Sequence, residues 1–117
     1  MMNMENLYFE NQHIDYIGRG ENKFTLFVAY KSDPKLRIIG YIDYSLLSTD
    51  ELYVDFVEVL NEERGKGIAK SLYQKLYELN KQCSFERAGY YSHEGSHIRK
   101  WFEENILQTI SEKKVIK

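Results

Sequence analysis

The sequence predicts a mixed α/β fold of the α+β type, in which an antiparallel meander of strands precedes a helical crossover, a parallel strand and a C-terminal helix. Three observations predict it. Runs of β-branched and aromatic residues in the first half are separated by turn signals. An amphipathic stretch with a helical period follows from Ile68 to Lys81. A short apolar run and a second helical stripe complete the pattern.

Four strands are predicted before the first helix. Their β-branched and aromatic side chains fit a pleated surface, and segments rich in glycine, proline, asparagine and aspartate between them predict turns. The predicted strands are Leu7–Ile17, Phe24–Tyr30, Ile38–Ser48 and Leu52–Leu60, and the predicted turns are Gly18–Asn22, Ser32–Lys35 and Ser48–Glu51. The short connections between the last three strands favour an antiparallel meander.

The second half of the chain predicts two helices around one further strand. The first helix places its apolar residues on one face and its charges opposite: Ile68, Leu72, Leu76 and Leu79. A fifth strand is predicted at Arg87–Tyr91. Its connection to the fourth strand through a helix is a parallel crossover, which should be right-handed. The last helix is predicted from its apolar stripe: Ile98, Trp101, Phe102, Ile106 and Ile110.

Length and composition fit a single domain over residues 1–117, since 117 residues with 43% hydrophobic content can bury one core. The net charge of −2 argues against nucleic acid as a partner. The single cysteine, Cys83, cannot form an internal disulfide and favours a reducing compartment such as the cytoplasm. The apolar stretches are too short to span a membrane.

The most informative segment is Arg64–Ala69, which reads Arg-Gly-Lys-Gly-Ile-Ala between the fourth strand and the first helix. The first amides of a helix lack partners within the helix, and the helix dipole adds positive partial charge there. Gly65 and Gly67 let an anion approach this backbone. The segment thus predicts a phosphate-binding turn, although glycine and lysine are also common in ordinary loops. Three cationic side chains accompany it: Arg64, Lys66 and Lys70.

The segment does not match the Walker loop, and it fails the dinucleotide pattern Gly-x-Gly-x-x-Gly because Lys70 stands at the third glycine. With Val57-Glu58-Val59 before it and Lys70-Ser71-Leu72 after it, it resembles the acetyl-CoA-binding motif of the GNAT N-acetyltransferase superfamily, Gln/Arg-x-x-Gly-x-Gly/Ala. The resemblance implies acetyl-CoA as cofactor, held between two strands that splay apart. It implies these cofactor contacts: Val57, Val59, Arg64, Gly65, Lys66, Gly67, Ile68, Ala69 and Lys70.

Two further segments, Gly40–Ser45 and Asp55–Val59, are similar to very small acetyltransferases encoded by phages, one group of which serves as anti-CRISPR proteins. This likeness implies a compact GNAT-like domain and a phage or mobile-element setting. Compared with the family, the chain has no room for the usual pair of helices between its first two strands. Only Gln108–Lys117 follow the last helix, where the family usually adds two strands. An open acceptor side is therefore expected, which suits the lysine side chain of a protein acceptor.

Acetyl transfer to an amine needs a group that takes a proton, because a free lysine titrates near ~10.4. Four side chains in or just before the fourth strand are candidates: Glu51, Tyr53, Asp55 and Glu58. Glu58 or Asp55, acting through a water, is favoured as the base, and a solvated surface carboxylate is the alternative for each. Strand alternation puts Tyr53, Asp55, Val57 and Val59 on one face. The family often has a bulge in this strand, which would change the facing of Asp55 relative to Glu58.

The leaving thiolate benefits from a proton donor, which the family often supplies as a tyrosine of the last helix. Here Phe102 occupies the matching position, and phenylalanine has no proton to donate. The candidate substitutes are Tyr90, Tyr91, His93 and His97, with water as a further alternative. The two histidines are expected in a loop around Gly95.

These observations favour an N-acetyltransferase that moves an acetyl group from acetyl-CoA to an amine. The missing phenol at Phe102 favours an alternative, a catalytically weak or inactive GNAT-fold module that acts by binding a protein partner. A nucleic-acid-binding α/β domain is a third reading, which the negative net charge disfavours. Neither a metal site nor a membrane contact is expected.

Overall fold

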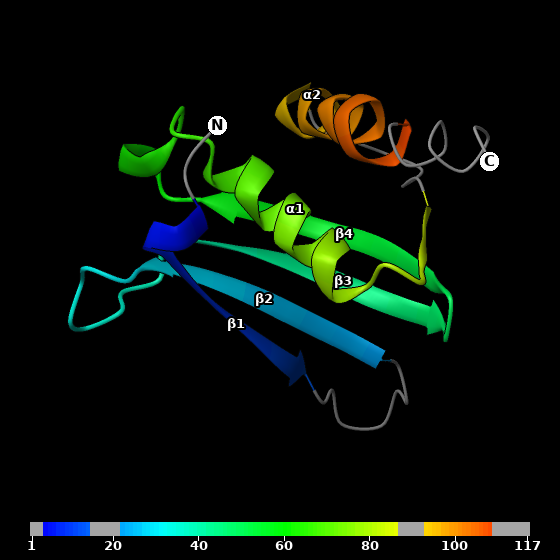
Figure 1. The fold of residues 1–117 in the computed structure, drawn as a ribbon, viewed down its shortest axis with the longest axis horizontal. Helices are drawn as coiled ribbons and strands as arrows, with labels where there is room; N and C mark the ends of the chain where they lie inside the picture. The colour runs from blue at the N-terminus through cyan, green and yellow to red at the C-terminus, as the bar shows by residue number, and fades with distance from the viewer. Residues whose placement is uncertain (1–3, 15–21, 87–92, 109–117) are drawn as a thin grey trace.

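A computed structural model describes residues 4–14, 22–86 and 93–108, which form a five-stranded sheet with two helices on one of its faces (Figure 1). The strands follow one another across the sheet in sequence order: β1 (Leu7–Ile14), β2 (Asn22–Tyr30), β3 (Gly40–Ser48), β4 (Glu51–Val59) and β5 (Ser84–Glu86). The first four pair antiparallel, and β5 pairs parallel to β4. The predicted fold class, with its meander and parallel crossover, is confirmed.

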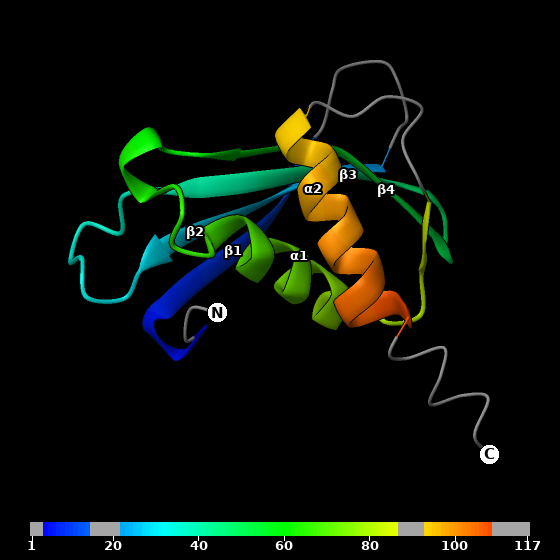
Figure 2. The same ribbon diagram turned by 90° about the horizontal axis from the view of Figure 1, so that it is seen from above.

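Helix α1 (Ile68–Leu79) packs on the sheet, and α2 (His93–Phe102) lies beside it, as the view from above shows (Figure 2). A π-helical turn, η3 (Glu103–Leu107), continues α2. Two short 3₁₀ turns, η1 (Met4–Asn6) and η2 (Asn61–Glu63), precede β1 and follow β4. No helix among residues 4–14, 22–86 and 93–108 is long and apolar enough to cross a membrane.

The strand boundaries differ from the predicted ones by a few residues at most where both can be compared. The predicted fifth strand, Arg87–Tyr91, lies outside the described residues, and the described parallel strand ends just before it at Glu86. The first predicted strand likewise extends beyond the described part, which ends at Ile14.

The core lies between the sheet and the helices. From α1, Ile68, Leu72 and Leu76 are at most 1% exposed, as the predicted stripe requires. Leu79, the fourth residue of that stripe, is 46% exposed, because the helix ends there and its last turn passes the edge of the core. Phe102 anchors α2: it is completely buried, with its ring 4.9 Å from that of Tyr73.

Gly40 sets how closely α1 can approach the sheet. It lies opposite Val59 in the β3–β4 register. A β-carbon at this position would stand 3.0 Å from the carbonyl oxygen of Glu58 and 3.3 Å from Cγ2 of Ile68, the first residue of α1. The bare backbone therefore lets the beginning of α1 rest on the beginning of β3, beside the end of β4.

Replacing Gly40 by alanine is expected to destabilise the protein by about 1–3 kcal/mol, because the new methyl group overpacks this contact and backbone has to shift. Thermal unfolding measures the effect as a Tm lower by several degrees. Leu47→Ala, on the same strand but at a side chain that is 60% exposed, is the control and should unfold near the wild-type temperature. An unchanged Tm for Gly40→Ala would contradict the assignment.

Candidate functional site

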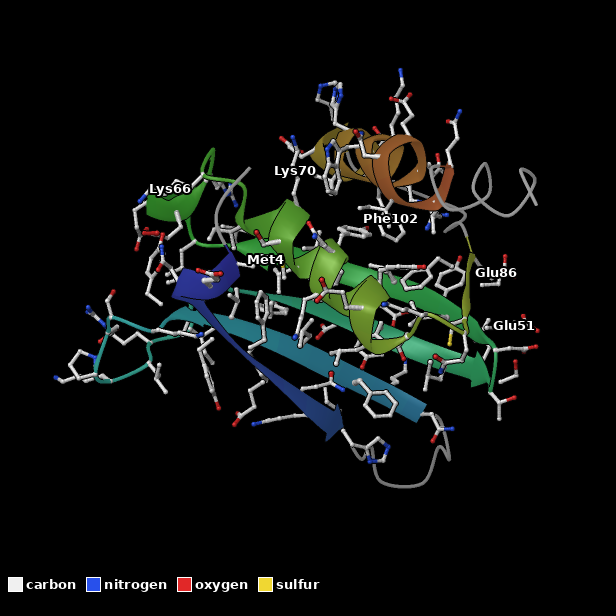
Figure 3. All side chains as sticks on the ribbon, in the orientation of Figure 1. Met4, Glu51, Lys66, Lys70, Glu86 and Phe102 are labelled. Carbon is white, nitrogen blue, oxygen red and sulfur yellow. The ribbon has the colours of Figure 1, made fainter. Side chains whose placement is uncertain are left out.

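A cleft of about 890 Å³ opens where β4 ends and both helices begin. Four segments line it: Phe56–Val59 of β4, the loop Glu63–Gly67, Ile68–Lys70 of α1, and Glu94, Gly95 and Ile98 of α2. Figure 3 shows Lys66 beside the loop before α1, and Lys70 between α1 and α2. Every residue predicted as a cofactor contact lies in this lining.

The beginning of α1 presents backbone amides to this cleft. Gly67 is the N-cap residue, and its left-handed φ of 88° is a conformation that glycine adopts without steric cost. The first helical hydrogen bond runs from the Ser71 amide to the Gly67 carbonyl at 3.0 Å. Gly67 offers no side-chain cap, and the amides of Ile68, Ala69 and Lys70 have no hydrogen-bond acceptor within the described part of the chain. These donors are therefore free to bind an anion.

The three cations of the loop are each engaged with the chain itself. Nε of Arg64 donates to the Val59 carbonyl at 3.1 Å, and its guanidinium lies 4.0 Å from Glu58. Nζ of Lys66 donates to Glu63 at 3.2 Å. Nζ of Lys70 stands 5.3 Å from the centre of the Trp101 ring, a cation–π contact. The amides at the start of α1, by contrast, have no such contact within the described residues.

Glu63 fixes the loop to the sheet. It accepts a hydrogen bond of 2.5 Å from the Tyr30 hydroxyl of β2, and it pairs with Lys66. The hydrogen bond from Tyr30, followed by the contacts with Lys66, lowers the pKa of Glu63 below its ordinary value of 4.5. The same hydrogen bond raises the pKa of Tyr30. The carboxylate therefore stays ionised while it holds both partners.

Within the described residues, β4 and β5 form three residue pairs, from Glu51 with Ser84 to Tyr53 with Glu86. Beyond Tyr53, β4 has a strand partner only on its β3 side within the described residues, and the cleft opens along its other edge. Arg99 of α2, which is 3% exposed, donates to the carbonyls of Phe85 and Glu86 and so ties the end of β5 to α2.

A β-bulge interrupts β4 at Asp55. Asp43 of β3 lies opposite Phe56, while the next residue, Tyr44, lies opposite Val54, so Asp55 is the extra residue. The side chains before and after the bulge therefore alternate in opposite phase. Val57 and Val59 pack against the core, as Leu52 and Val54 do. The expectation that Tyr53, Asp55, Val57 and Val59 share one face is wrong, because the bulge reverses the alternation.

The described residues give little support for a metal site or a cysteine nucleophile. No group of three or more potential metal ligands occurs among them. The thiol of Cys83 is buried and weakly bonded to the Thr49 carbonyl at 3.8 Å. Burial, with a contribution from Asp50, raises its pKa, which disfavours the thiolate that a nucleophile needs.

The profile of the Acetyltransferase (GNAT) family matches residues 2–97. The chain belongs to the GNAT acetyltransferase family. The family uses acetyl-CoA, which confirms the cofactor prediction at the level of the family. The phage-like compact form has no support from this match. No curated protein matches the chain.

Solved structures share the fold at low sequence identity. An aminoglycoside acetyltransferase from an uncultured soil metagenomic sample is 17% identical, with a TM-score of 0.52 over 75% of this chain and 60% of that one. A ribosomal-protein-alanine N-acetyltransferase from Brucella melitensis biovar Abortus 2308 is 22% identical, with a TM-score of 0.51 over 71% and 60%. This GNAT chain thus spans 60% of the length of each.

The GNAT candidates for acid–base chemistry lie in different surroundings. Glu58 lines the cleft with its side chain 45% exposed. Asp55 accepts a 2.6 Å hydrogen bond from Ser45, lies 3.9 Å from Nζ of Lys23, and is not part of the cleft lining. Glu51 and Tyr53 lie where β4 pairs with β5, before the cleft opens.

The predicted histidine loop is wrong, because His93 and His97 lie in the first turns of α2. Packing of the helix through Ile98, Trp101 and Phe102 outweighs the poor helix propensity of Gly95. Both histidines are exposed, their rings lie 4.6 Å apart, and neither lines the cleft. Tyr90 and Tyr91 lie outside the described residues.

Phe102 is a core residue in this GNAT chain. Its ring packs 4.9 Å from Tyr73 and 5.2 Å from Phe85, between α2 and the sheet (Figure 3). Sequence reasoning missed Glu94 and Gly95 as cleft residues because it expected a loop there, and it interpreted Ile98 only as part of the apolar stripe of the last helix. It also missed Glu63. The available signal was its position, since this acidic residue directly precedes the Arg64–Gly67 turn.

Replacing Tyr30 by phenylalanine tests the Glu63 anchor through its pH dependence. A carboxylate with a lowered folded pKa stabilises the protein above its unfolded pKa, and this contribution is lost as the pH falls through the folded value. Tyr30→Phe should therefore be less stable than wild type at neutral pH, and the difference should narrow below pH 4.5. Urea unfolding at both pH values measures it. In a Glu63→Gln background the effect of Tyr30→Phe should not depend on pH; an effect independent of pH in the wild-type background would contradict the assignment.

Proposed function

We propose that this chain is an acetyltransferase that moves the acetyl group of acetyl-CoA to an amine, with a lysine side chain of a protein as acceptor. The observation that carries the proposal is the uncapped start of α1, whose amides face a cleft bordered by β4. Family membership supports the same donor. A helix N-terminus of this kind suits the pyrophosphate of CoA, because amides and helix dipole act on the same anion.

The residues present fit the cofactor. The amides of Ile68, Ala69 and Lys70 would hold the pyrophosphate, and Gly67 leaves room for it. The backbone of Val57 and Val59 borders the cleft on a strand edge and would take the pantetheine arm and the thioester carbonyl by hydrogen bonds. Arg64, Lys66, Gly65 and Lys70 would complete the loop around the phosphates, each cation exchanging part of its present contact for the ligand.

Bound acetyl-CoA would supply an activated acyl group as a thioester. The neutral amine attacks the carbonyl carbon, so that the C–N bond forms as the C–S bond breaks. Glu58 is the proposed base, acting through a water, because it is the candidate carboxylate of β4 that reaches the cleft. Asp55 is the alternative, held by Ser45 outside the lining.

The leaving thiolate takes a proton from water or from Tyr91, which lies outside the described residues. His93 stays a candidate donor only if its side chain turns toward the cleft from the first turn of α2.

The proposed acceptor side is open because only residues 15–21 separate β1 from β2. A phage or mobile-element effector acting in the cytoplasm on a host protein is the setting we propose, on the likeness of Gly40–Ser45 and Asp55–Val59.

A second candidate is a GNAT-fold module that binds a partner with weak or no catalysis. The burial of Phe102 favours it, because the position where the family often has a phenol is occupied by a core ring. The two candidates differ in whether thiol is released from acetyl-CoA when an amine is present.

Acetyl-CoA at a concentration well above its Kd should raise the Tm, since a ligand that binds only the folded state stabilises it. Acetylpantetheine, which lacks the pyrophosphate, should raise it far less. Gly67→Val should remove the acetyl-CoA shift because its side chain strains the left-handed turn and fills the anion site. Glu78→Gln, at the other end of α1, is the matched control and should keep the shift.

Circular dichroism without ligand shows whether Gly67→Val still folds. Thiol release with lysine-containing peptides then separates the two candidate functions. Release with wild type supports the transferase, and a thermal shift without release supports the binding module. A shift that survives in a folded Gly67→Val variant would mean that the phosphates bind elsewhere.

A further inference from the structure

The sheet face opposite the helices carries a row of aromatic rings. Within the described residues, α1 and α2 both lie on the other face (Figure 1). Phe27 of β2, Tyr41 of β3 and Phe56 of β4 stand side by side across the strands, with ring centres 6.3 and 6.2 Å apart. Phe56 is 51% exposed. An exposed aromatic row on a sheet face is costly to leave in water and is typical of a contact surface.

Carboxylates surround this row. Asp43 lies opposite Phe56, and Glu58 lies opposite Tyr41. Burial raises the pKa of the Tyr41 hydroxyl, and the negative charges of Asp43 and Glu58 raise it further. Both carboxylates therefore lie close enough to Tyr41 to affect its ionisation. The hydroxyl of Thr25 donates to Asp43 at 2.6 Å, which holds that carboxylate in place. We call this surface the acidic-aromatic patch: Phe27, Tyr41, Asp43, Asp55, Phe56 and Glu58.

The patch has few cations of its own. Lys23 lies 3.9 Å from Asp55, and the guanidinium of Arg64 lies 4.0 Å from Glu58 at the cleft end. Asp43 is bonded to the Thr25 hydroxyl and, among the described residues, pairs with no cation. Next to it on β1, Glu10 lies opposite Phe27 and adds a further carboxylate. The patch is therefore negative overall, with its excess charge at the β2–β3 side.

The patch is continuous with the cleft. Phe56 and Glu58 belong to both, because the bulge at Asp55 turns their side chains to this face while β4 forms the edge of the cleft. A molecule that lies across β2, β3 and β4 on this face therefore ends at the cleft, where the proposed function puts the thioester. Two strand spacings separate Phe27 from Glu58, roughly 10 Å, which about three residues of an extended segment span.

We propose that the acidic-aromatic patch docks a basic segment of the acceptor protein, with an arginine or lysine about three residues from the lysine that is acetylated. The inference rests on the proposed function, whose acceptor it specifies. Carboxylates pair with the cation, and the Tyr41 and Phe27 rings offer cation–π contacts to its side chain. A second copy of the chain fits poorly, because an isologous contact would bring two negative patches together. Nucleic acid is repelled for the same reason.

Two peptides of equal length test the proposal. Each carries one lysine, with arginine or glutamate three positions away. Binding is measured by fluorescence anisotropy without acetyl-CoA, and turnover by thiol release. Wild type should bind the arginine peptide more tightly, and added salt should weaken that preference. Asp43→Asn removes the charge but keeps a side-chain oxygen that can accept the hydrogen bond from Thr25. The Kd and KM for the arginine peptide should therefore rise about two- to five-fold.

Asp43→Lys should invert the preference between the two peptides, because it reverses the charge at the centre of the patch. The KM for acetyl-CoA should stay at the wild-type value in both variants, and Glu78→Gln should leave the peptide preference unchanged. Equal affinity of wild type for the two peptides, or an unaltered preference in a folded Asp43→Lys variant, would overturn the proposal. So would a dimer that forms in wild type and is lost in Asp43→Lys, since the patch would then serve a second copy.

The peptide-binding measurement without acetyl-CoA tests this proposal independently of the proposed transferase function. Charge-dependent peptide binding without thiol release would leave the docking surface standing and remove the transferase. Thiol release from both peptides at equal KM, insensitive to Asp43→Lys, would leave the transferase standing and remove the docking surface.

Discussion

The contact between Ile68 and Gly40 is the constraint on which the site depends. Because Gly40 has no side chain, Cγ2 of Ile68, the first residue of α1, can lie 3.3 Å from where a β-carbon would stand, over the beginning of β3 and beside the end of β4. This brings the unpaired amides of the helix start to the same edge as the backbone of Val57 and Val59. The left-handed Gly67 turns the chain sharply enough to make that approach from the η2 loop. A helix start further from the strand would separate the anion site from the acyl site.

The acidic and basic side chains around the cleft are nearly balanced in number. We therefore expect the affinity for an anion to depend on the fixed position of the backbone amides more than on net charge. Glu58, Glu63 and Glu94 stand among the same lining as the three cations. Lys66 and Arg64 are already engaged with carboxylates or carbonyls. The fixed amide dipoles at the start of α1 need no such exchange, since they have no competing acceptor among the described residues. The acidic residues then favour a cationic acceptor at the neighbouring surface.

The sequence predicted the fold, and it picked out the loop that lines the cleft, because both depend on local patterns. Alternating β formers, turn residues and the spacing of Ile68, Leu72 and Leu76 each act within a few residues. The parts it could not predict depend on contacts distant in sequence. The bulge at Asp55 depends on the register with β3, and the start of α2 depends on burial of Phe102 against Tyr73. Leu79 satisfied the stripe, yet the core ends before it.

The bulge also explains how one strand can serve two faces. In an unbroken strand, Tyr53, Asp55, Val57 and Val59 would project to the same side. With Asp55 as an extra residue, Val57 and Val59 pack toward α1 and support the cleft, while Phe56 and Glu58 turn toward Tyr41 on the open face. The bulge is held by the 2.6 Å hydrogen bond from Ser45 to Asp55. A carboxylate at position 58 can thus reach the cleft from the side opposite the helices, which is the side on which we propose that the acceptor docks.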